Sequence, residues 1–122
     1  MSEGASADGP VRARATTEES GRSRELERPP LPEPLRVAVA DSHCHLDIHD
    51  GDVGAPWLTV DAALEAAASV GVTRIVQVGC DLPSSRWAVA LANEHKAVVA
   101  TVALHPNEGP RLNDLDEALR EI

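Results

Sequence analysis

Two histidines near the middle of the chain have the spacing of a metal-ligand pair. The segment DSHCHLD, residues 41–47, places His43 and His45 two residues apart. Residues two apart on a β-strand face the same way, so both imidazoles are predicted on one face while Cys44 points away. Two neutral imidazoles at the end of a strand form a seat for a divalent metal ion, although an HxH pattern also arises as a mere pair of polar residues. The position directly after a Val-rich run favours the metal site, without selecting among Mg²⁺, Mn²⁺ and Zn²⁺.

The acidic residues around this pair are harder to assign. Asp47 is either a carboxylate that fixes the tautomer of a metal-binding histidine or a solvated loop residue. His49, Asp50 and Asp52 follow in an acidic segment that is predicted to be a flexible loop facing solvent. No chemical role is predicted for these three residues.

A third histidine lies in a comparable position later in the chain. His105 follows an apolar run and precedes Pro106, which biases the histidine towards an extended conformation. Its side chain is predicted near the same end of the sheet, where it would bind phosphate or position a substrate. The alternative is a histidine that caps the strand end without chemistry.

The remaining reactive or aromatic side chains are predicted to be structural. Cys44 and Cys80 have no neighbouring base or cation in the sequence, so we interpret both as small buried apolar residues rather than nucleophiles. Trp57 and Trp87 are predicted to pack in the core, and His95 is given no function.

The elements that must position these residues recur three times. Apolar runs at 35–40, 73–78 and 97–104 predict buried strands, and each is followed by a loop and a helical segment. The helices are predicted from a Thr59 cap to Gly71, over 84–95 and over 112–122. Serial β-loop-α units require parallel strands, so the fold class is α/β.

The class leaves two architectures, a doubly wound sheet and a closed eight-stranded barrel. The candidate residues follow the strand ends in all three units: the histidine pair, then Cys80 and Asp81, then His105. No GxGxxG or GxxxxGK[ST] loop follows the first strand, which removes the main support for a nucleotide-binding doubly wound sheet. We therefore favour a partial TIM-type barrel with three of its eight β-α units.

Composition divides the chain into a tail and a folded part. Residues 1–35 are rich in Ser, Glu, Arg, Gly and Pro and are predicted to be a disordered N-terminal tail, whose charges nearly cancel. Most of the net charge of −9 therefore lies in residues 36–122. An acidic domain disfavours nucleic-acid binding through lysine and arginine, so metal ions would have to attract any phosphate. No apolar leader or membrane-spanning run is present, and the cytoplasm is the expected location.

Three segments in order resemble a known family. DSHCHLD, GVTRIVQVGCDLPSSRWAVALA and VVATVALHPNEGP are together similar to the start of a TatD-type metal-dependent hydrolase, over about residues 36–122. The resemblance implies a TIM-type barrel, two divalent metal ions and hydrolysis of phosphodiester bonds, usually of DNA, in the cytoplasm. It places His43 and His45 at the first metal-ligand pair and His105 at a histidine that contacts substrate phosphate. Ala103 stands where glycine is commoner in the family.

The resemblance also implies residues that this sequence lacks. The family's later Glu, His and Asp ligands would lie beyond Ile122, so residues 36–122 are expected to be the N-terminal portion of a barrel. The chain alone is expected to be inactive and marginally stable. Two other readings stay open: another HxH-barrel hydrolase, either an amidohydrolase or a PHP-type phosphoesterase, and a non-catalytic remnant or interaction module.

Overall fold

The computed structural model describes residues 12–14, 21, 28–50 and 58–122. Three parallel strands form its central sheet, in the order β2 (Val39–Cys44), β4 (Val72–Val78) and β5 (Val98–Thr101). In this part of the chain no helix is long and apolar enough to cross a membrane.

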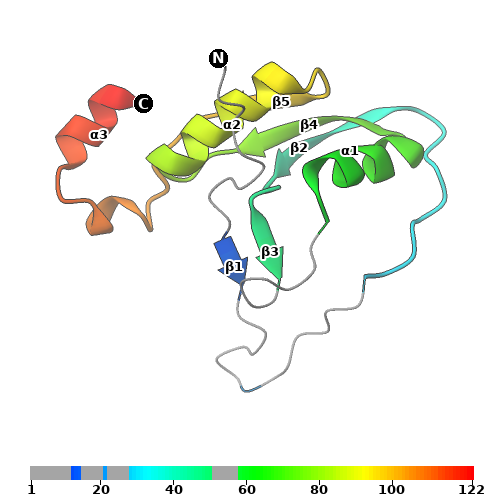
Figure 1. The fold of residues 1–122 in the computed structure, drawn as a ribbon, viewed down its shortest axis with the longest axis horizontal. Coiled ribbons are helices and arrows are strands. Elements are labelled where there is room, and N and C mark those ends of the chain that lie inside the picture. Colours follow the sequence, from blue (N-terminus) through cyan, green and yellow to red (C-terminus); the bar gives the residue numbers. More distant parts are fainter. Residues whose placement is uncertain (1–11, 15–20, 22–27, 51–57) are drawn as a thin grey trace, which may run out of the picture.

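Helices connect and follow these strands in the expected order (Figure 1). α1 (Val60–Ser69) links β2 to β4, α2 (Leu82–Glu94) links β4 to β5, and α3 (Leu115–Glu121) follows β5. α1 packs against β4, whereas α2 packs against both β4 and β5. The predicted α/β class and the three β-α units are therefore confirmed.

Local sequence signals set the helix ends. The Thr59 side chain accepts a hydrogen bond from the Ala62 N–H at 3.2 Å, as predicted for the N-cap of α1. Gly71 follows that helix with a φ of 93°, the left-handed conformation that glycine adopts without a steric penalty. α2 begins at a capping box, in which Asp81 and Ser84 each accept a hydrogen bond from the other's backbone N–H. Asp81 thus caps α2.

The core lies between α2 and the two strands it covers. Its buried apolar side chains belong to β4, α2, β5 and α3: Ile75, Ala88, Leu91, Val98 and Ala118. Trp87 is half-buried on α2, and Trp57 lies outside the described residues. Arg86 of α2 forms an ion pair with Glu121 of α3, which joins the last helix to this layer.

The first strand differs from its prediction in position and in burial. It was expected at residues 35–40 as a buried strand, but β2 occupies Val39–Cys44 and its side chains are largely exposed. β4 determines this placement, because pairing starts only at Val39 opposite Val72 and ends at Cys44 opposite Gln77. β2 lies at one edge of the sheet, so a Val-rich sequence alone does not bury it.

Pairing between β2 and β4 is irregular at two places. One irregularity falls between Val39 and Ala40, and the other between Asp41 and Cys44. In the second, three steps along β2 match two steps along β4, so β2 carries one extra residue there. This extra residue lies in the part of the strand that contains His43.

A second, two-stranded sheet involves the segment predicted to be a tail. β1 (Arg12–Arg14) pairs in parallel with β3 (Ile48–Asp50). Three residues of the predicted tail therefore belong to a strand, while residues 1–11, 15–20 and 22–27 lie outside the described part. His49 is half-buried in β3 instead of facing solvent from a flexible loop, and Asp52 lies outside the described residues.

Gly79, at the junction of β4 and α2, allows an unusually close approach. A Cβ at this position would lie 2.3 Å from Ser85 Oγ and 2.7 Å from Ser85 Cα. The Cα belongs to the first turns of α2 and cannot rotate away, so Gly79→Ala is expected to destabilise the fold by about 1–3 kcal/mol. Chemical denaturation of the two proteins measures the difference.

Gly109 provides the matched control, because a Cβ there would meet nothing within 4 Å. We expect Gly109→Ala to change the free energy of unfolding by less than about 0.5 kcal/mol. Equal stabilities of the two alanine variants would contradict the close packing at Gly79.

Candidate metal centre

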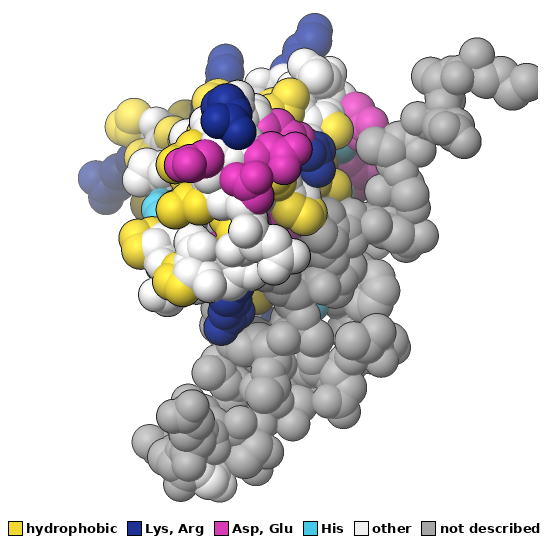
Figure 2. Space-filling view, turned by 90° about the vertical axis from the view of Figure 1, so that its left-hand side faces the viewer, with side chains coloured by type: hydrophobic (Ala, Val, Ile, Leu, Met, Phe, Trp, Pro, Cys, Tyr) yellow, Lys and Arg dark blue, Asp and Glu magenta, His cyan; other side chains and the backbone are white. Residues whose placement is uncertain are grey.

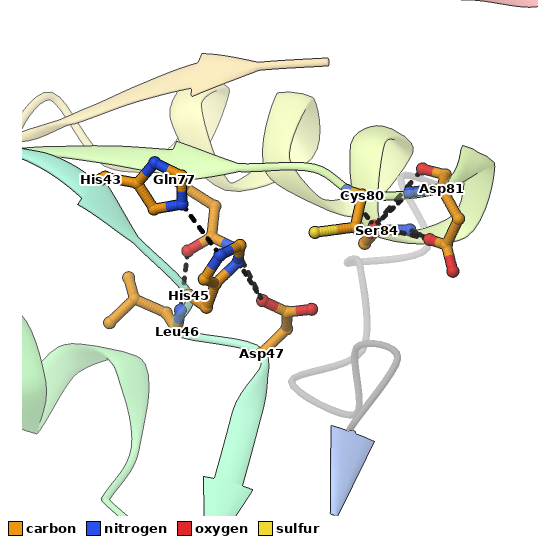
Figure 3. Close-up of polar contacts among 8 residues, drawn as sticks. All are labelled: His43, His45, Leu46, Asp47, Gln77, Cys80, Asp81 and Ser84. Carbon is orange, nitrogen blue, oxygen red and sulfur yellow. Dashed lines mark hydrogen bonds and ion pairs between the residues drawn. The ribbon is translucent and has the colours of Figure 1, made fainter. Parts of the chain in front are cut away.

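The two imidazoles of the DSHCHLD segment converge as predicted. His43 is the penultimate residue of β2, and His45 follows the last residue of the strand. Their Nε2 atoms are 3.2 Å apart, and the ring planes meet at 73° (Figure 3). The backbone N–H of His43 donates to the Asp41 carboxylate at 3.0 Å, which orients the strand just before the pair.

This separation fits two ligands of a single metal ion. Metal–nitrogen bonds of about 2.0–2.1 Å place two neighbouring ligand nitrogens roughly 2.8–3.4 Å apart, the shorter values in octahedral and the longer in tetrahedral geometry. The 3.2 Å between the Nε2 atoms lies in that range. Within residues 28–50 and 58–122 no group of three or more His, Cys, Asp or Glu side chains is close enough to hold a metal ion. Among the described residues, His43 and His45 thus present two ring nitrogens at a spacing that fits one metal ion.

A buried polar pair lies beneath His45. The side chain of Gln77, on β4, accepts a hydrogen bond from the Leu46 N–H at 2.7 Å and donates one to Asp47 Oδ1 at 2.8 Å (Figure 3). Gln77 is 0% exposed and Asp47 is 3% exposed. Asp47 is therefore not a solvated loop residue, and burial of both groups is offset by their mutual hydrogen bond.

Gln77 is not among the residues that the sequence predicts for the site. The signal that identifies it is a single glutamine in the otherwise apolar end of the predicted strand 73–78. A polar side chain in such a strand must find a partner when it is buried.

The Nδ1 atom of His45 faces this polar pair. It lies 4.0 Å from Asp47 Oδ1 and is buried without a hydrogen-bond partner. A carboxylate at this distance favours a proton on Nδ1 over a lone pair. A proton on Nδ1 leaves the lone pair on Nε2, the atom that faces His43.

His105 lies in a loop that two hydrogen bonds attach to the neighbouring unit. The sequence predicts strand up to residue 104, but β5 ends at Thr101. The Ser85 hydroxyl replaces strand pairing there, because it accepts from the Ala103 N–H at 3.2 Å. The His105 N–H donates to the Cys80 carbonyl at 2.7 Å. The loops after β4 and β5 are thereby joined.

The ring of His105 has a defined orientation of donor and acceptor. Its Nδ1 accepts a hydrogen bond from the Asn107 N–H at 3.0 Å, so the proton of the neutral ring is on Nε2. The ring is exposed. His105 therefore presents an N–H donor, which suits a phosphate oxygen, rather than a lone pair.

One cleft contains all three histidines predicted for the site. Its volume is about 370 Å³, and it is lined by residues at or after the ends of β2, β4 and β5: His43, His45, Val78, Gly79, Cys80, Ala103, Leu104, His105, Pro106, Asn107 and Glu108. The carboxyl ends of parallel strands meet at one edge of a sheet, which explains why segments 60 residues apart share this cleft. His95 lies outside it, at the C-cap of α2.

The two cysteines are only partly buried, whereas the sequence predicts buried residues. Cys44 and Cys80 are both half-exposed, and Cys80 lines the cleft. Partial burial raises the pKa of the Cys44 thiol, and the nearby Asp41 carboxylate raises it further.

A raised pKa keeps Cys44 a thiol near neutral pH. We expect iodoacetamide to alkylate Cys44 more slowly at pH 8 than it alkylates free cysteine, measured in Cys80→Ser protein so that only one thiol reacts. Unfolding in denaturant should restore the ordinary rate. A folded-state rate equal to that of free cysteine would contradict the prediction.

Comparison with known proteins agrees with this arrangement. The family model described as TatD related DNase matches residues 40–122. The "Uncharacterized metal-dependent hydrolase TatD" of Mycobacterium tuberculosis (strain ATCC 25618 / H37Rv) is 40% identical over 83 residues, which are 66% of this chain and 29% of the relative. No solved structure matches the chain.

The matched region contains the histidine pair, β4, α2, β5 and the His105 loop. Its three parallel β-α units agree with a partial β/α barrel. This chain, which spans less than a third of the relative's length, belongs to the TatD family of metal-dependent hydrolases.

Proposed function

We propose that this chain contributes part of the active site of a cytoplasmic deoxyribonuclease, which hydrolyses phosphodiester bonds with water activated by two divalent metal ions. The observation that carries the proposal is the pair of Nε2 atoms 3.2 Å apart in a cleft shared with His105. The family description, TatD related DNase, supports DNA as the substrate.

Each histidine has a separate task in this proposal. His43 and His45 hold one ion through their Nε2 atoms. When bound, such an ion polarises a phosphate oxygen and lowers the pKa of a water molecule. His105 donates its Nε2 proton in a hydrogen bond to an oxygen of the phosphate and so orients it in the cleft.

Charge supports the dependence on metal ions. The chain has a net charge of −9. Figure 2, which views the molecule from the side of α3, shows acidic side chains gathered together and lysine and arginine side chains scattered around them. Such a surface repels a polyanion. Bound cations at the histidine cleft would supply the attraction that this surface lacks.

A chimera tests the function directly. The matching segment of this chain replaces its counterpart in the M. tuberculosis relative, which supplies the rest of the barrel. We expect the chimera to hydrolyse DNA with added Mg²⁺, Mn²⁺ or Zn²⁺ and to lose this activity in EDTA. The 122-residue chain without the rest of the barrel should show little or none.

The substrate panel separates the proposal from a small-molecule hydrolase. Phosphate monoesters and small amides are assayed beside DNA with the same chimera. Hydrolysis of either small substrate without DNA hydrolysis, in a chimera that folds and binds metal, would contradict the deoxyribonuclease assignment.

A further inference from the structure

The fully buried side-chain amide of Gln77 makes two hydrogen bonds to the segment that follows β2. The side chain sits on the central strand β4, thirty residues from Asp47 in sequence, and both ends of its amide are used. Its oxygen accepts a hydrogen bond from the backbone N–H of Leu46, and its nitrogen donates one to the carboxylate of Asp47. The two residues that it holds directly follow His45.

His45 needs such support because the sheet does not provide it. β2 ends at Cys44, which pairs with Gln77 itself, so His45 lies one residue beyond the last pairing. Beyond the last paired residue, the Gln77 side chain thus supplies the hydrogen bond that attaches this segment to β4. Asp47, fixed by Gln77, then lies 4.0 Å from the buried Nδ1 of His45.

We propose that Gln77 is a positioning residue of the metal centre, which holds Asp47 so that the His45 ring keeps its proton on Nδ1 and directs its Nε2 lone pair at the metal. Metal-binding imidazoles generally donate their second nitrogen to a carboxylate or carbonyl that sets the tautomer. Here the carboxylate is oriented by an amide from the neighbouring strand. The inference rests on the proposed metal-binding role of His45.

The alternative is that Gln77 only stabilises the turn after β2. Both roles predict a loss of stability when the amide is removed, so stability alone does not separate them. The tautomer of His45 and the affinity for metal do, because a structural role leaves both unchanged in protein that remains folded.

The test uses the whole 122-residue chain without metal at about pH 8, where an ordinary imidazole is neutral. Long-range ¹H–¹⁵N NMR spectra report which nitrogen of each ring carries the proton, and a His45→Gln variant assigns the His45 signals. We expect the Nδ1–H form of His45 in the parent chain and a loss of that preference in Gln77→Leu. Titration calorimetry with Zn²⁺ should show about a 10- to 100-fold weaker affinity in this variant.

A swapped pair separates the stabilising role of the hydrogen bond from the positioning of His45. Gln77→Glu keeps an acceptor for the Leu46 N–H but sets a second carboxylate against Asp47. In the double variant Asp47→Asn/Gln77→Glu, the new amide donates to the new carboxylate, and its nitrogen takes the place that Asp47 Oδ1 holds near His45 Nδ1. We expect the double variant to recover the stability that Gln77→Glu alone loses, but neither the Nδ1–H form of His45 nor the Zn²⁺ affinity, because a donor replaces the carboxylate oxygen near Nδ1. This comparison also decides the question if Gln77→Leu does not fold.

Ile75→Val on the same strand is the matched control, since it trims a buried side chain without touching the amide pair. It should leave the tautomer and the affinity unchanged. An unaltered His45 tautomer in folded Gln77→Leu, or a swapped pair that shows the Nδ1–H form and the parent Zn²⁺ affinity, would overturn the inference. Absence of Zn²⁺ binding in the parent chain would instead count against the proposed function, while the tautomer spectra would still decide the role of Gln77.

Discussion

His45→Ala is expected to lower the Zn²⁺ affinity of the chain by more than about 100-fold, beyond the range found for residues that only support a ligand. In the proposed site the described residues supply two metal ligands, so removing one would leave a single imidazole that binds no better than a surface histidine. Titration calorimetry of the parent and the variant measures the difference. His43→Ala should also lower the affinity, because it removes the other Nε2 atom of the pair.

His95→Ala is the control for this experiment. His95 lies at the C-cap of α2, outside the cleft, and its removal should leave the Zn²⁺ affinity unchanged. If His45→Ala bound Zn²⁺ as tightly as the parent chain, the convergence of the two rings would have no role in metal binding.

His105→Ala is expected to reduce the kcat of the chimera for DNA by about 10²- to 10³-fold, the usual effect of removing one donor to a developing negative charge. Its Nδ1 is occupied by the Asn107 N–H, so the ring offers a donor and no metal ligand. The Zn²⁺ affinity should therefore stay at the parent value. Steady-state kinetics and calorimetry on the same preparation test both statements.

His105→Gln tests the chemical reason for that loss. Glutamine retains an N–H donor of similar reach, so it should recover part of the kcat that alanine loses. A His105→Ala chimera with weakened Zn²⁺ affinity and unchanged kcat would reverse the roles assigned to the three histidines.

Much of the fold follows from patterns that act locally. The apolar run 73–78 became β4, and the Thr59 cap and Gly71 terminator delimit α1 as predicted. These features depend on neighbours within one or two turns, so the sequence displays them directly. The position of a strand at the edge of a sheet does not follow from such local patterns. β2 begins four residues later than predicted and is exposed, because pairing with β4 determines its position. This pairing involves residues more than thirty positions away.

The candidate site shows the same division. Strand alternation predicted that His43 and His45 lie side by side, and they do. The cause is not strand alternation alone, because His45 lies outside the strand. The hydrogen-bonded pair of Gln77 and Asp47 lies next to it. The sequence leaves two roles open for Asp47, because the burial of Asp47 depends on a glutamine thirty residues later.

The two irregularities in the pairing of β2 with β4 are of opposite sense. Between Val39 and Cys44 the strand advances five residues, and β4 also advances five, from Val72 to Gln77. The register thus shifts by one residue at the first irregularity and shifts back at the second, before the strand ends. Losing or gaining one residue between 40 and 44 would leave the shift uncorrected and turn the histidines to the opposite surface of the sheet, so this short stretch should tolerate substitutions far better than changes in its length.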